Sequence, residues 1–409
     1  MKDVLSRLLN RRFLQPDTHG SISMPVYSGA AFEFETAEAM EDAFLGKSGR
    51  HTYSRISNPT VEAFEDRIKQ ISGARQVLAL SSGMAAISNV FMTVAYAGSN
   101  IVTSTHLFGN TFSLFLFTLE AFGVEVRFCN LLDPDDVAKH IDEKTCAVFV
   151  EVITNPHLEV VDLKALSAVA HRRKAPLVAD STLIPWPYFD AQSLGVDLEV
   201  VSSTKYISGG ATSIGGLILD HQTFDWSVSP RLKALAQTQG KTAFSIKLRG
   251  EISRNMGAYM SPHTAWLQNL GLETLELRYK RAASTCKRLA EFLQTLPAVQ
   301  QVNYTGLTDN PFYRISVEQF GEYAGAMLTF CLNDRAACYA FINRVQLIRR
   351  ATNLFDNKSL VIHPLSTIYG PLSDEYKKMV EVPDNMLRLS VGLEDFEDLK
   401  ADIVQALEK

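Results

Sequence analysis

Three short segments of the chain carry residue types that could act together on one small molecule. Lys205 closes the run Val200-Val-Ser-Ser-Thr-Lys205 directly after an apolar stretch, and Asp180 closes Pro176-Leu-Val-Ala-Asp180 in the same way. Upstream of both, Leu80-Ser-Ser-Gly-Met84 joins an apolar stretch to a helical pattern. Ligands of α/β sheets bind beyond the carboxyl ends of the strands. The segments therefore predict one binding site along one edge of a sheet.

The residue types in these segments suit pyridoxal phosphate. A buried lysine has a lowered pKa and can form a Schiff base with the aldehyde of this cofactor. An aspartate can pair with the pyridine nitrogen and keep the ring protonated, which makes it an electron sink. Amide groups at a helix N-terminus bind phosphate, and a glycine lets them approach it closely. Each segment alone also fits a surface lysine, a helix-capping aspartate or an ordinary turn, so the prediction depends on their occurring together.

The elements that must position these residues alternate between strand and helix patterns over about residues 60 to 220. Strands joined by helical crossovers are parallel, and strands that are apolar on both faces lie between layers of helices. We therefore predict an α/β fold with a mostly parallel seven-stranded sheet. The expected strands are Gln76–Leu80, Asn100–Ser104, Val124–Phe128, Cys146–Val152, Ala175–Ala179, Leu198–Ser202 and Gly216–Leu219, with crossover helices that include Thr60–Ile71, Gly83–Ala97 and Leu163–Arg173.

The chain has 409 residues, more than the usual length of one domain. Residues 1–58 lack the strand and helix rhythm and predict an extended N-terminal arm, and residues 59–260 form the predicted large, cofactor-binding domain. From residue 261 the pattern changes, which predicts a smaller C-terminal α+β domain over residues 261–409. Its expected elements are a helical stretch Thr264–Leu293, strands near Gln300–Tyr304 and Ala324–Cys331, and a closing helix Asp395–Leu407.

The composition excludes several classes of protein. Apolar residues make up 46% of the chain, charged residues 21%, and the net charge is -5, which argues against disorder and against nucleic-acid binding by bulk charge. No apolar run approaches the ~20 residues of a membrane-spanning helix, and the first residues do not have the pattern of a secretory signal. The five cysteines and nine histidines show no metal-site spacing. We expect a cytoplasmic protein without a metal, a nucleic-acid partner or a membrane.

Several motifs, in a fixed order along the chain, resemble those of the Cys/Met-metabolism family of pyridoxal-phosphate enzymes, of the aspartate-aminotransferase fold type I. The resemblance covers nearly the whole chain, and Arg278 is a single matching position outside the longer motifs. Its motifs are Tyr53-Ser-Arg55-Ile-Ser-Asn58-Pro-Thr60, Ser82-Gly-Met-Ala-Ala86, Glu151-Val-Ile-Thr-Asn155-Pro156, Ser202-Ser-Thr-Lys205, Ser261-Pro262 and Arg388-Leu-Ser-Val-Gly-Leu-Glu394.

The resemblance implies a role for each matching residue. Lys205 forms the Schiff base and moves protons, Asp180 holds the pyridine nitrogen, and Asn155 binds the ring hydroxyl and lies near the substrate. Phe108 stacks on the cofactor ring. The implied phosphate ligands are the amides of Gly83 and Met84, the hydroxyls of Ser202 and Thr204, and Tyr53 and Arg55 from a neighbouring subunit, with Tyr53 also placed among the catalytic residues. The implied carboxylate site is Arg388 with Ser359 beside it. A doubly charged phosphate indeed suits an arginine and clustered donors.

One position departs from the family in a way that bears on the leaving group. Where most members stack a tyrosine on the cofactor, this chain has Leu107-Phe108-Gly109, so the ring stays and the hydroxyl is lost. A carboxylate leaves unaided, whereas a thiolate, whose conjugate acid has a pKa of about 8.5, leaves better with a proton. Phe108 therefore favours an O-acyl substrate over a thioether. A hydroxyl from elsewhere, such as that of Tyr369 or Tyr53, could still supply the proton.

A second departure is Leu354-Phe-Asp-Asn-Lys358-Ser359-Leu360, where many members have Leu-Gly-Gly-x-Glu-Ser-Leu. It predicts a bulkier wall of altered charge beside the substrate side chain. Other segments look most like the O-acetylhomoserine sulfhydrylase branch of the family. These segments are Ala211–Gly216, Gly306–Tyr313, Gln319-Phe320 and Gly325–Phe330.

The resemblance implies a transferase of methionine biosynthesis that replaces the ester at the γ-carbon of O-acetyl-L-homoserine by sulfur and gives homocysteine. Sulfide and a sulfur-carrier protein both fit as the sulfur source, and a succinyl ester fits as well as an acetyl ester. Cystathionine γ-synthase, cystathionine γ-lyase and methionine γ-lyase are alternatives within the family. The family also implies a homodimeric active unit that assembles into a homotetramer.

Two other classes of protein fit the sequence less well. A nicotinamide enzyme is disfavoured because no predicted strand is followed by G-x-G-x-x-G. A non-catalytic binding protein on the same scaffold would not need to keep Lys205 and Asp180 together.

Overall fold

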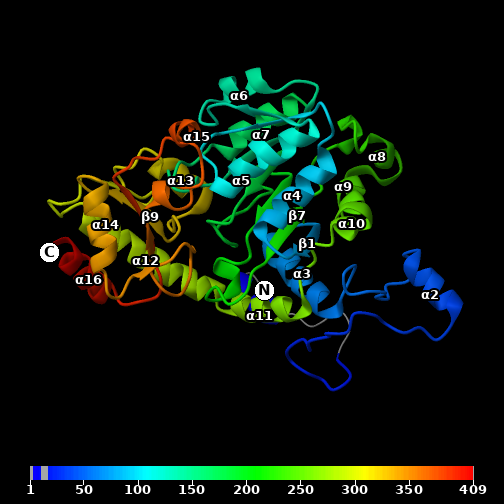
Figure 1. Cartoon of the computed structure of the whole chain (residues 1–409). Helices are drawn as coiled ribbons and strands as arrows, with labels where there is room; N and C mark the ends of the chain where they lie inside the picture. The colour runs from blue at the N-terminus through cyan, green and yellow to red at the C-terminus, as the bar shows by residue number, and fades with distance from the viewer. Residues whose placement is uncertain (1–2, 11–16, 409) are drawn as a thin grey trace.

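A seven-stranded sheet forms the centre of the computed structural model, which describes residues 3–10 and 17–408 (Figure 1). The strand order is β1-β7-β6-β5-β4-β2-β3. Strands β2 to β6 are parallel, and β7 is antiparallel to both of its neighbours, so the predicted mostly parallel sheet is confirmed. The strands are β1 (Gln76–Leu80), β2 (Asn100–Thr103), β3 (Glu125–Phe128), β4 (Thr145–Glu151), β5 (Leu177–Asp180), β6 (Leu198–Val201) and β7 (Gly216–Asp220).

Side-chain alternation along the strands explains why helices cover both faces of this sheet. In β1, Val77 and Ala79 belong to one apolar core, and Leu78 and Leu80 belong to the other. The first core is covered by α3 (Pro59–Ser72), α6 (Pro134–His140), α7 (Leu163–Arg172) and α11 (Pro262–Glu273). The second core is covered by α4 (Gly83–Val94), α5 (Gly109–Ser113), α8 (Lys233–Gln239) and α9 (Ala243–Lys247).

A second, smaller sheet lies in the C-terminal part of the chain, with the order β10-β11-β12-β9-β8 (Figure 1). Its strands are β8 (Gln301–Asn303), β9 (Met327–Cys331), β10 (Arg349–Arg350), β11 (Leu360–Ile362) and β12 (Met386–Ser390). The accompanying helices are α12 (Leu275–Leu293), α13 (Tyr313–Phe320), α14 (Arg335–Arg344), α15 (Asp374–Met379) and α16 (Phe396–Glu408). One apolar core continues from the large sheet into this part, and the domain boundary at residue 260 stays a prediction.

Short helical turns join the main elements. Two are π-type, η1 (Leu114–Leu119) and η6 (Leu248–Ser253), and η6 leads directly into α10 (Arg254–Met256). The others are 3-10 turns: η2 (Glu120–Phe122), η3 (Tyr206–Ser208), η4 (Trp226–Val228), η5 (Gly240–Thr242) and η7 (Pro364–Ser366). No helix among the described residues combines the length and the apolar character that crossing a membrane requires.

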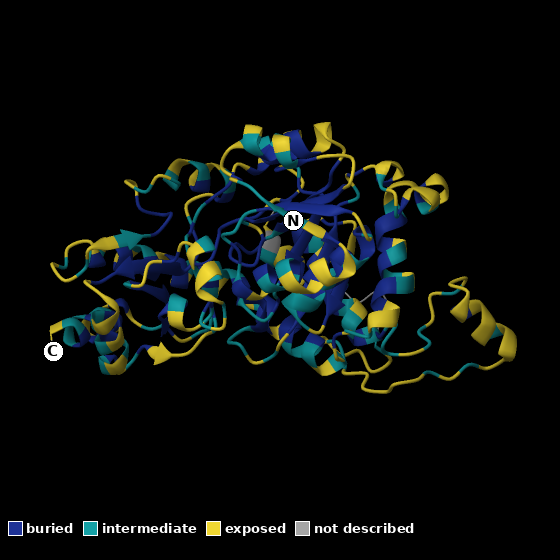
Figure 2. Cartoon of the chain, turned by 45° about the horizontal axis from the view of Figure 1, so that its top comes forward, coloured by how far each residue is buried: buried dark blue, intermediate teal, exposed yellow. Residues whose placement is uncertain are grey.

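The N-terminal part of the chain leaves the body of the molecule. After α1 (Val4–Leu9), which packs on α3 and α11, the described chain resumes at residue 17 and carries α2 (Ala37–Phe44) away from the two sheets (Figures 1 and 2). Residues 1, 2 and 11–16 of the predicted arm lie outside the described residues. Apolar side chains on this part are exposed, among them Ile22, Met40, Phe44 and Leu45. Exposed apolar residues gathered on one segment are typical of a surface that contacts another chain.

Candidate functional site

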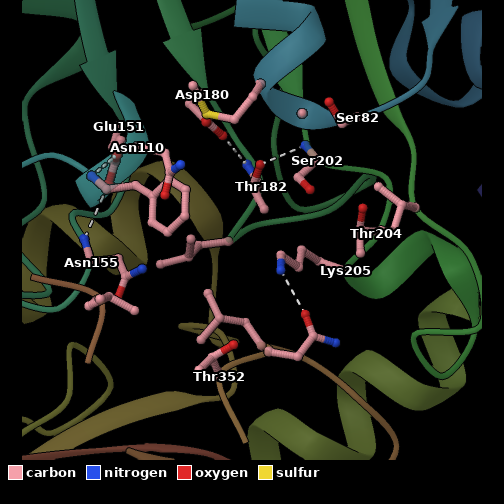
Figure 3. Close-up of a pocket in the computed structure, with 18 of the residues that line it drawn as sticks. Ser82, Asn110, Glu151, Asn155, Asp180, Thr182, Ser202, Thr204, Lys205 and Thr352 are labelled. Carbon is pink, nitrogen blue, oxygen red and sulfur yellow. Dashed lines mark hydrogen bonds between the residues drawn. The ribbon is translucent and has the colours of Figure 1, made fainter. Parts of the chain in front are cut away.

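One cavity of about 870 Å³ lies at the carboxyl ends of the central strands (Figure 3). It brings together most of the residues that the sequence predicts for the site. These are Gly83, Met84, Phe108, Asn155, Asp180, Ser202, Thr204, Lys205 and Arg388. The large sheet and the loops that follow its strands supply one side of the wall. The part of the chain that carries the smaller sheet supplies the other side, with Thr352, Asn353, Leu354, Asp356 and Arg388.

Lys205 lies in the loop that follows β6, and its ammonium group points across the cavity (Figure 3). Its Nζ donates a hydrogen bond to Oδ1 of Asn353 at 2.7 Å. Burial and, to a smaller extent, the nearby positive charge of Arg388 lower the pKa of Lys205 to about 8, and the attraction of Asp180 opposes this only in part. A lysine with this pKa has a neutral, nucleophilic fraction near neutral pH, which Schiff-base formation requires.

Asp180 is the last residue of β5 and faces the same cavity. Its Oδ1 accepts a hydrogen bond from the backbone amide of Thr182 at 3.0 Å. Burial raises the pKa of Asp180 to about 6, and the hydrogen bonds from Thr182 and the charge of Lys205 oppose that rise. Asp180 is therefore ionised at neutral pH and can pair with a protonated ring nitrogen.

The N-terminus of α4 forms a cradle beside the loop that carries Ser202. Ser82 caps this helix by accepting a hydrogen bond from the amide of Ala85 at 3.0 Å. A Cβ atom on Gly83 would lie only 2.8 Å from Cβ of Ser202, so only glycine permits this approach. The amides of the first helical turn and the Ser202 hydroxyl line the cavity here, while Thr204 also exchanges hydrogen bonds with the backbone of Gly215.

Arg388 is buried on β12, and its guanidinium group points to the cavity from the side of the smaller sheet. Nη1 donates to Oδ1 of Asn155 at 3.1 Å, and Nη2 donates to the carbonyl oxygen of Thr352 at 3.2 Å. Nε is buried and has no hydrogen-bond partner. Burial lowers the pKa of Arg388 to about 10. A buried cation with an unused donor is suited to bind a carboxylate.

Glu151 is the last residue of β4 and lies next to Asp180 of β5. Glu151 is not among the predicted site residues. Its carboxylate accepts hydrogen bonds from the amides of Phe108 at 2.6 Å and Asn155 at 3.3 Å. Burial, with a smaller contribution from the charge of Asp180, raises the pKa of Glu151 to about 8. Glu151 thus holds the backbone of Phe108 and of Asn155, the two residues predicted to contact the cofactor ring and its hydroxyl. The sequence feature that could have indicated Glu151 is a charged residue at the end of an apolar strand.

Tyr369 supports the same two segments from behind. Its buried hydroxyl lies 3.0 Å from the carbonyl oxygens of Leu107 and Asn155 and donates between them. Burial raises the pKa of Tyr369, and the residue does not line the cavity. Because its hydroxyl donates its proton to these carbonyl oxygens, Tyr369 is poorly placed to act as the proton donor that Phe108, which has no hydroxyl, cannot be.

Three of the predicted site residues, Tyr53, Arg55 and Ser359, lie outside this cavity. Tyr53 and Arg55 stay on the N-terminal part, where the Arg55 guanidinium donates to the carbonyl oxygen of Arg254 at 2.5 Å. The Ser359 hydroxyl donates to Glu394 at 2.9 Å and accepts from the amide of Gly392.

Within Leu354–Leu360, the segment for which a bulkier wall of altered charge is predicted, neither Phe355 nor Lys358 lines the cavity. Phe355 is buried and stacks on Tyr206 at 4.0 Å between ring centroids, and Lys358 is exposed, so neither side chain narrows the cavity. Asp356, between them, lines it instead.

Asn353 and Thr182 also belong to the site, although the sequence analysis did not single them out as site residues. Thr182 Oγ1 accepts a hydrogen bond from the amide of Ser202 at 2.8 Å, which joins the segments after β5 and β6. Thr182 could have been predicted as a site residue because it lies two residues after Asp180. Asn353 lies 148 residues from Lys205 along the chain, and no spacing pattern connects two residues so far apart.

A group of three potential metal ligands occurs outside the cavity in the described part of the chain. Cys129, Asp136 and His140 place ligand atoms within 4.8 Å of one another. Asp136 also accepts a hydrogen bond from the amide of Asn130 at 3.0 Å, and its carbonyl oxygen contacts His140 Nδ1 at 2.9 Å. The Asp136 carboxylate and the His140 ring therefore already have partners within the chain.

The donor set of the cavity fits pyridoxal phosphate. The cavity holds a lysine of lowered pKa, which matches the aldehyde, and an ionised aspartate, which matches the ring nitrogen. It also holds a helix N-terminus, which a glycine leaves open, and a hydroxyl, and both match the phosphate. The unpaired Arg388 Nε leaves a further donor for an anionic substrate.

Comparisons with known proteins agree with this donor set. The family model described as Cys/Met metabolism PLP-dependent enzyme matches residues 8–408. An O-acetyl-L-homoserine sulfhydrylase of Corynebacterium glutamicum is 34% identical over 398 residues, covering 93% of this chain and 91% of the relative. An L-methionine gamma-lyase of Fusobacterium nucleatum is 34% identical over 393 residues, covering 96% and 94%. Identity to these two relatives therefore does not separate replacement from elimination.

Solved structures lead to the same family. The O-acetylhomoserine sulfhydrylase of the methionine biosynthetic pathway of Wolinella succinogenes is 48% identical, with a TM-score of 0.78 and coverage of 87% of this chain and 99% of that one. A putative O-acetylhomoserine (thiol)-lyase of Campylobacter jejuni, 30% identical with a TM-score of 0.92 and full coverage of both chains, holds N'-pyridoxyl-lysine-5'-monophosphate at its position 205. The chain described here belongs to the Cys/Met-metabolism family of pyridoxal-phosphate-dependent enzymes.

Proposed function

We propose that this enzyme is an O-acetylhomoserine sulfhydrylase, which replaces the acetyl ester of O-acetyl-L-homoserine by sulfur to give homocysteine for methionine biosynthesis. The observation that carries the proposal is the bare ring of Phe108 in a cavity that also holds Lys205, Asp180 and Arg388. The identity to sulfhydrylases over nearly the whole chain supports it. Sulfide or a sulfur-carrier protein supplies the sulfur, and the cytoplasm is the proposed location.

Each residue of the cavity has a separate task in this reaction. Arg388 binds the α-carboxylate of the substrate, and Lys205 Nζ removes the proton from the α-carbon and helps to move one from the β-carbon. Asp180 holds a proton at the ring nitrogen of the cofactor. Pyridoxal phosphate, when bound, supplies an electron sink for the negative charge that develops on the substrate carbons. Phe108 stacks on the ring, and Glu151 fixes the backbone of Phe108.

The leaving group decides between replacement of an ester and cleavage of a thioether. Acetate leaves as a stable anion, whereas a thiolate leaves faster when a positioned group protonates it. Phe108 offers no proton, and the Tyr369 hydroxyl is hydrogen-bonded to two carbonyl oxygens behind the cavity. Within the cavity wall of the described chain, no tyrosine side chain is present, and Tyr53 of a second copy has the cofactor phosphate as its proposed ligand. This favours the ester over cystathionine or methionine as the substrate.

A second copy of the chain completes the site in this proposal. Tyr53 and Arg55 do not reach the cavity of their own chain, and the exposed apolar side chains of the N-terminal part need a covering surface. We propose a homodimeric active unit in which Tyr53 and Arg55 of each chain bind the cofactor phosphate of the other, and a homotetramer built from two such dimers.

The proposed function is tested with the purified, cofactor-loaded protein. O-acetylhomoserine with sulfide is expected to give homocysteine, because acetate can leave without a proton donor. Methionine and cystathionine are expected to give 2-oxobutyrate at least ~100-fold more slowly, the low end of what a positioned proton donor contributes. Chromatographic quantification of both products measures the two reactions. Efficient cleavage of either thioether, together with no homocysteine from the ester, would overturn the proposal.

The substitution Phe108→Tyr isolates the leaving-group argument. It restores a hydroxyl beside the departing group and is expected to raise 2-oxobutyrate formation from methionine by ~10-fold or more, while homocysteine formation from O-acetylhomoserine changes by only a few-fold. Steady-state kinetics on both substrates measure the ratio. Phe108→Leu, which removes the stacking ring without adding a hydroxyl, is the control and should lower both rates. A tyrosine variant that loses both activities would show that the cavity requires the bare ring.

A further inference from the structure

The wall of the Lys205 cavity carries few charged groups. Its cations are Lys205 and Arg388, and its acids are Glu151, Asp180 and Asp356. Under the proposed function, on which this inference rests, Lys205 binds the cofactor and Arg388 binds the α-carboxylate of the substrate. Neither of these cations is then available to pair with a second negative charge on the substrate.

Two of the three acidic residues have partners that account for their presence in the cavity. Asp180 lies at the carboxyl end of β5, where the ring nitrogen of the cofactor is expected, and accepts the Thr182 amide. Glu151 accepts the amides of Phe108 and Asn155. Asp356 is the remaining acid of the cavity, and no step of the proposed reaction uses it.

The backbone places Asp356 beyond the anchoring points of the substrate. The segment that leads to it begins at Thr352, whose carbonyl oxygen accepts from Arg388 Nη2 at 3.2 Å, and continues with Asn353, which accepts from Lys205 Nζ at 2.7 Å. Its far end is tied to the loop after Lys205, because Asn357 Nδ2 donates to the carbonyl oxygen of Gly209 at 2.8 Å. Asp356 thus faces the space that a substrate side chain enters after the α-carbon.

The charge of Asp356 is only partly compensated. Its Oδ1 accepts from the backbone amide of Lys358 at 3.1 Å and from Lys358 Nζ at 3.2 Å. The Asp356 side chain is 12% exposed, whereas that of Lys358 is 61% exposed. Water screens the exposed ammonium group more than the enclosed carboxylate. A negative field therefore remains on the cavity side.

We propose that Asp356 is a specificity-determining residue that selects neutral acyl groups. A homoserine ester whose acyl chain ends in a carboxylate, such as the succinyl ester, would bring that carboxylate toward Asp356, and the wall formed by the described residues holds no uncommitted cation to receive it. Arg55 of the partner subunit does not relieve this, because its proposed ligand is the cofactor phosphate. The acetyl ester carries no such charge and enters without repulsion.

The experiment compares two esters on the cofactor-loaded enzyme with sulfide. We measure kcat/KM for O-succinylhomoserine and O-acetylhomoserine at low and high salt. The wild-type succinyl-to-acetyl ratio is expected to rise with salt, because counter-ions screen the repulsion. Asp356→Asn is expected to raise the low-salt ratio roughly ten-fold, as a like-charge contact at partial burial predicts, and to remove most of its salt dependence. Glu322→Gln, an exposed acid elsewhere in the C-terminal part, is the charge-matched control and should leave the ratio as in the wild type.

A second substitution separates Asp356 from its neighbour. Lys358→Gln removes the partial compensation and is expected to lower the succinyl-to-acetyl ratio. The inference would be overturned if the ratio were identical in wild type and Asp356→Asn. It would also be overturned if the wild-type ratio did not respond to salt, and this measurement does not depend on the folding of any variant. If the wild-type enzyme turns over neither ester, the proposed function fails. If it uses the acetyl ester and the ratio does not move, only the role of Asp356 fails.

Discussion

Replacing Lys205 by alanine is expected to reduce homocysteine formation by roughly 10⁴-fold, because the variant loses both the covalent anchor of the cofactor and the base that moves protons. The visible absorption of the bound cofactor should disappear as well. Borohydride treatment of the wild type, followed by peptide mapping, is expected to place the reduced pyridoxyl group on Lys205. Lys205 is the only lysine among the described residues that line the cavity, which is why it is the proposed nucleophile.

The control for this prediction is Lys378→Ala, which removes an exposed lysine at the end of α15 and should retain both colour and activity. Circular dichroism establishes that the Lys205 variant is folded. A folded Lys205→Ala protein that still carries a borohydride-reducible cofactor and turns over the ester would contradict the assignment.

The lowered pKa of Lys205 adds a pH dependence to cofactor loading. Only the neutral amine attacks an aldehyde, and a pKa of about 8 means that the neutral fraction falls as the pH drops through that value. The initial rate at which cofactor-free enzyme regains its visible absorption should therefore rise with pH and level off above about pH 8. A lysine of ordinary pKa would keep gaining rate up to about pH 10.

Mixing two inactive variants should restore activity if Arg55 serves the partner's site. Arg55→Ala chains keep Lys205, and Lys205→Ala chains keep Arg55, so one of the two sites in a mixed dimer contains both residues. Random exchange at equal amounts is expected to bring activity back to about a quarter of the wild-type value, since half of the dimers are mixed and each has one intact site. Each variant alone should stay far below this level, because a phosphate loses its bidentate ligand or the cofactor loses its anchor.

Subunit exchange must be followed separately, for example with one variant carrying an affinity tag. The measurement is homocysteine formation before and after exchange, with the tagged and untagged chains captured together as proof of mixing. Recovery without exchange would indicate contamination by active protein. Complete exchange without recovery would place Arg55 in the site of its own chain, or outside the site altogether.

The sequence predicted the large sheet well because its strands are short apolar runs that end in polar or small residues. Cys146–Val150 is apolar at every position and lies inside β4, and Asp180 and Lys205 each follow such a run. The reversed direction of β7 was not predicted. The link from β6 to β7, residues 202–215, holds only the short turn η3 and no crossover helix, which is the physical reason for an antiparallel neighbour.

The contacts that shape the second half of the site could not be derived from spacing. Tyr369 reaches the carbonyl oxygen of Leu107 across 262 residues, and Arg388 reaches Asn155 across 233. Such contacts depend on how two sheets pack, which local patterns do not encode. The sequence also did not indicate which side chains of Leu354–Leu360 line the cavity: Phe355 has a positive φ of 53° and stacks on Tyr206, whereas Asp356 lines the cavity.

The arrangement of the cavity also orders events during synthesis of the protein. Every residue that would hold the cofactor ring and phosphate within one chain precedes the end of the large sheet at Asp220, while Arg388 lies on β12, with only α16 still to follow. Chains fold from the N-terminus as they leave the ribosome. A growing chain can therefore assemble the predicted cofactor half of the site while Arg388 is still untranslated. A polypeptide interrupted before β12 would retain Lys205 without the arginine that helps to lower its pKa and that is proposed to bind the substrate carboxylate.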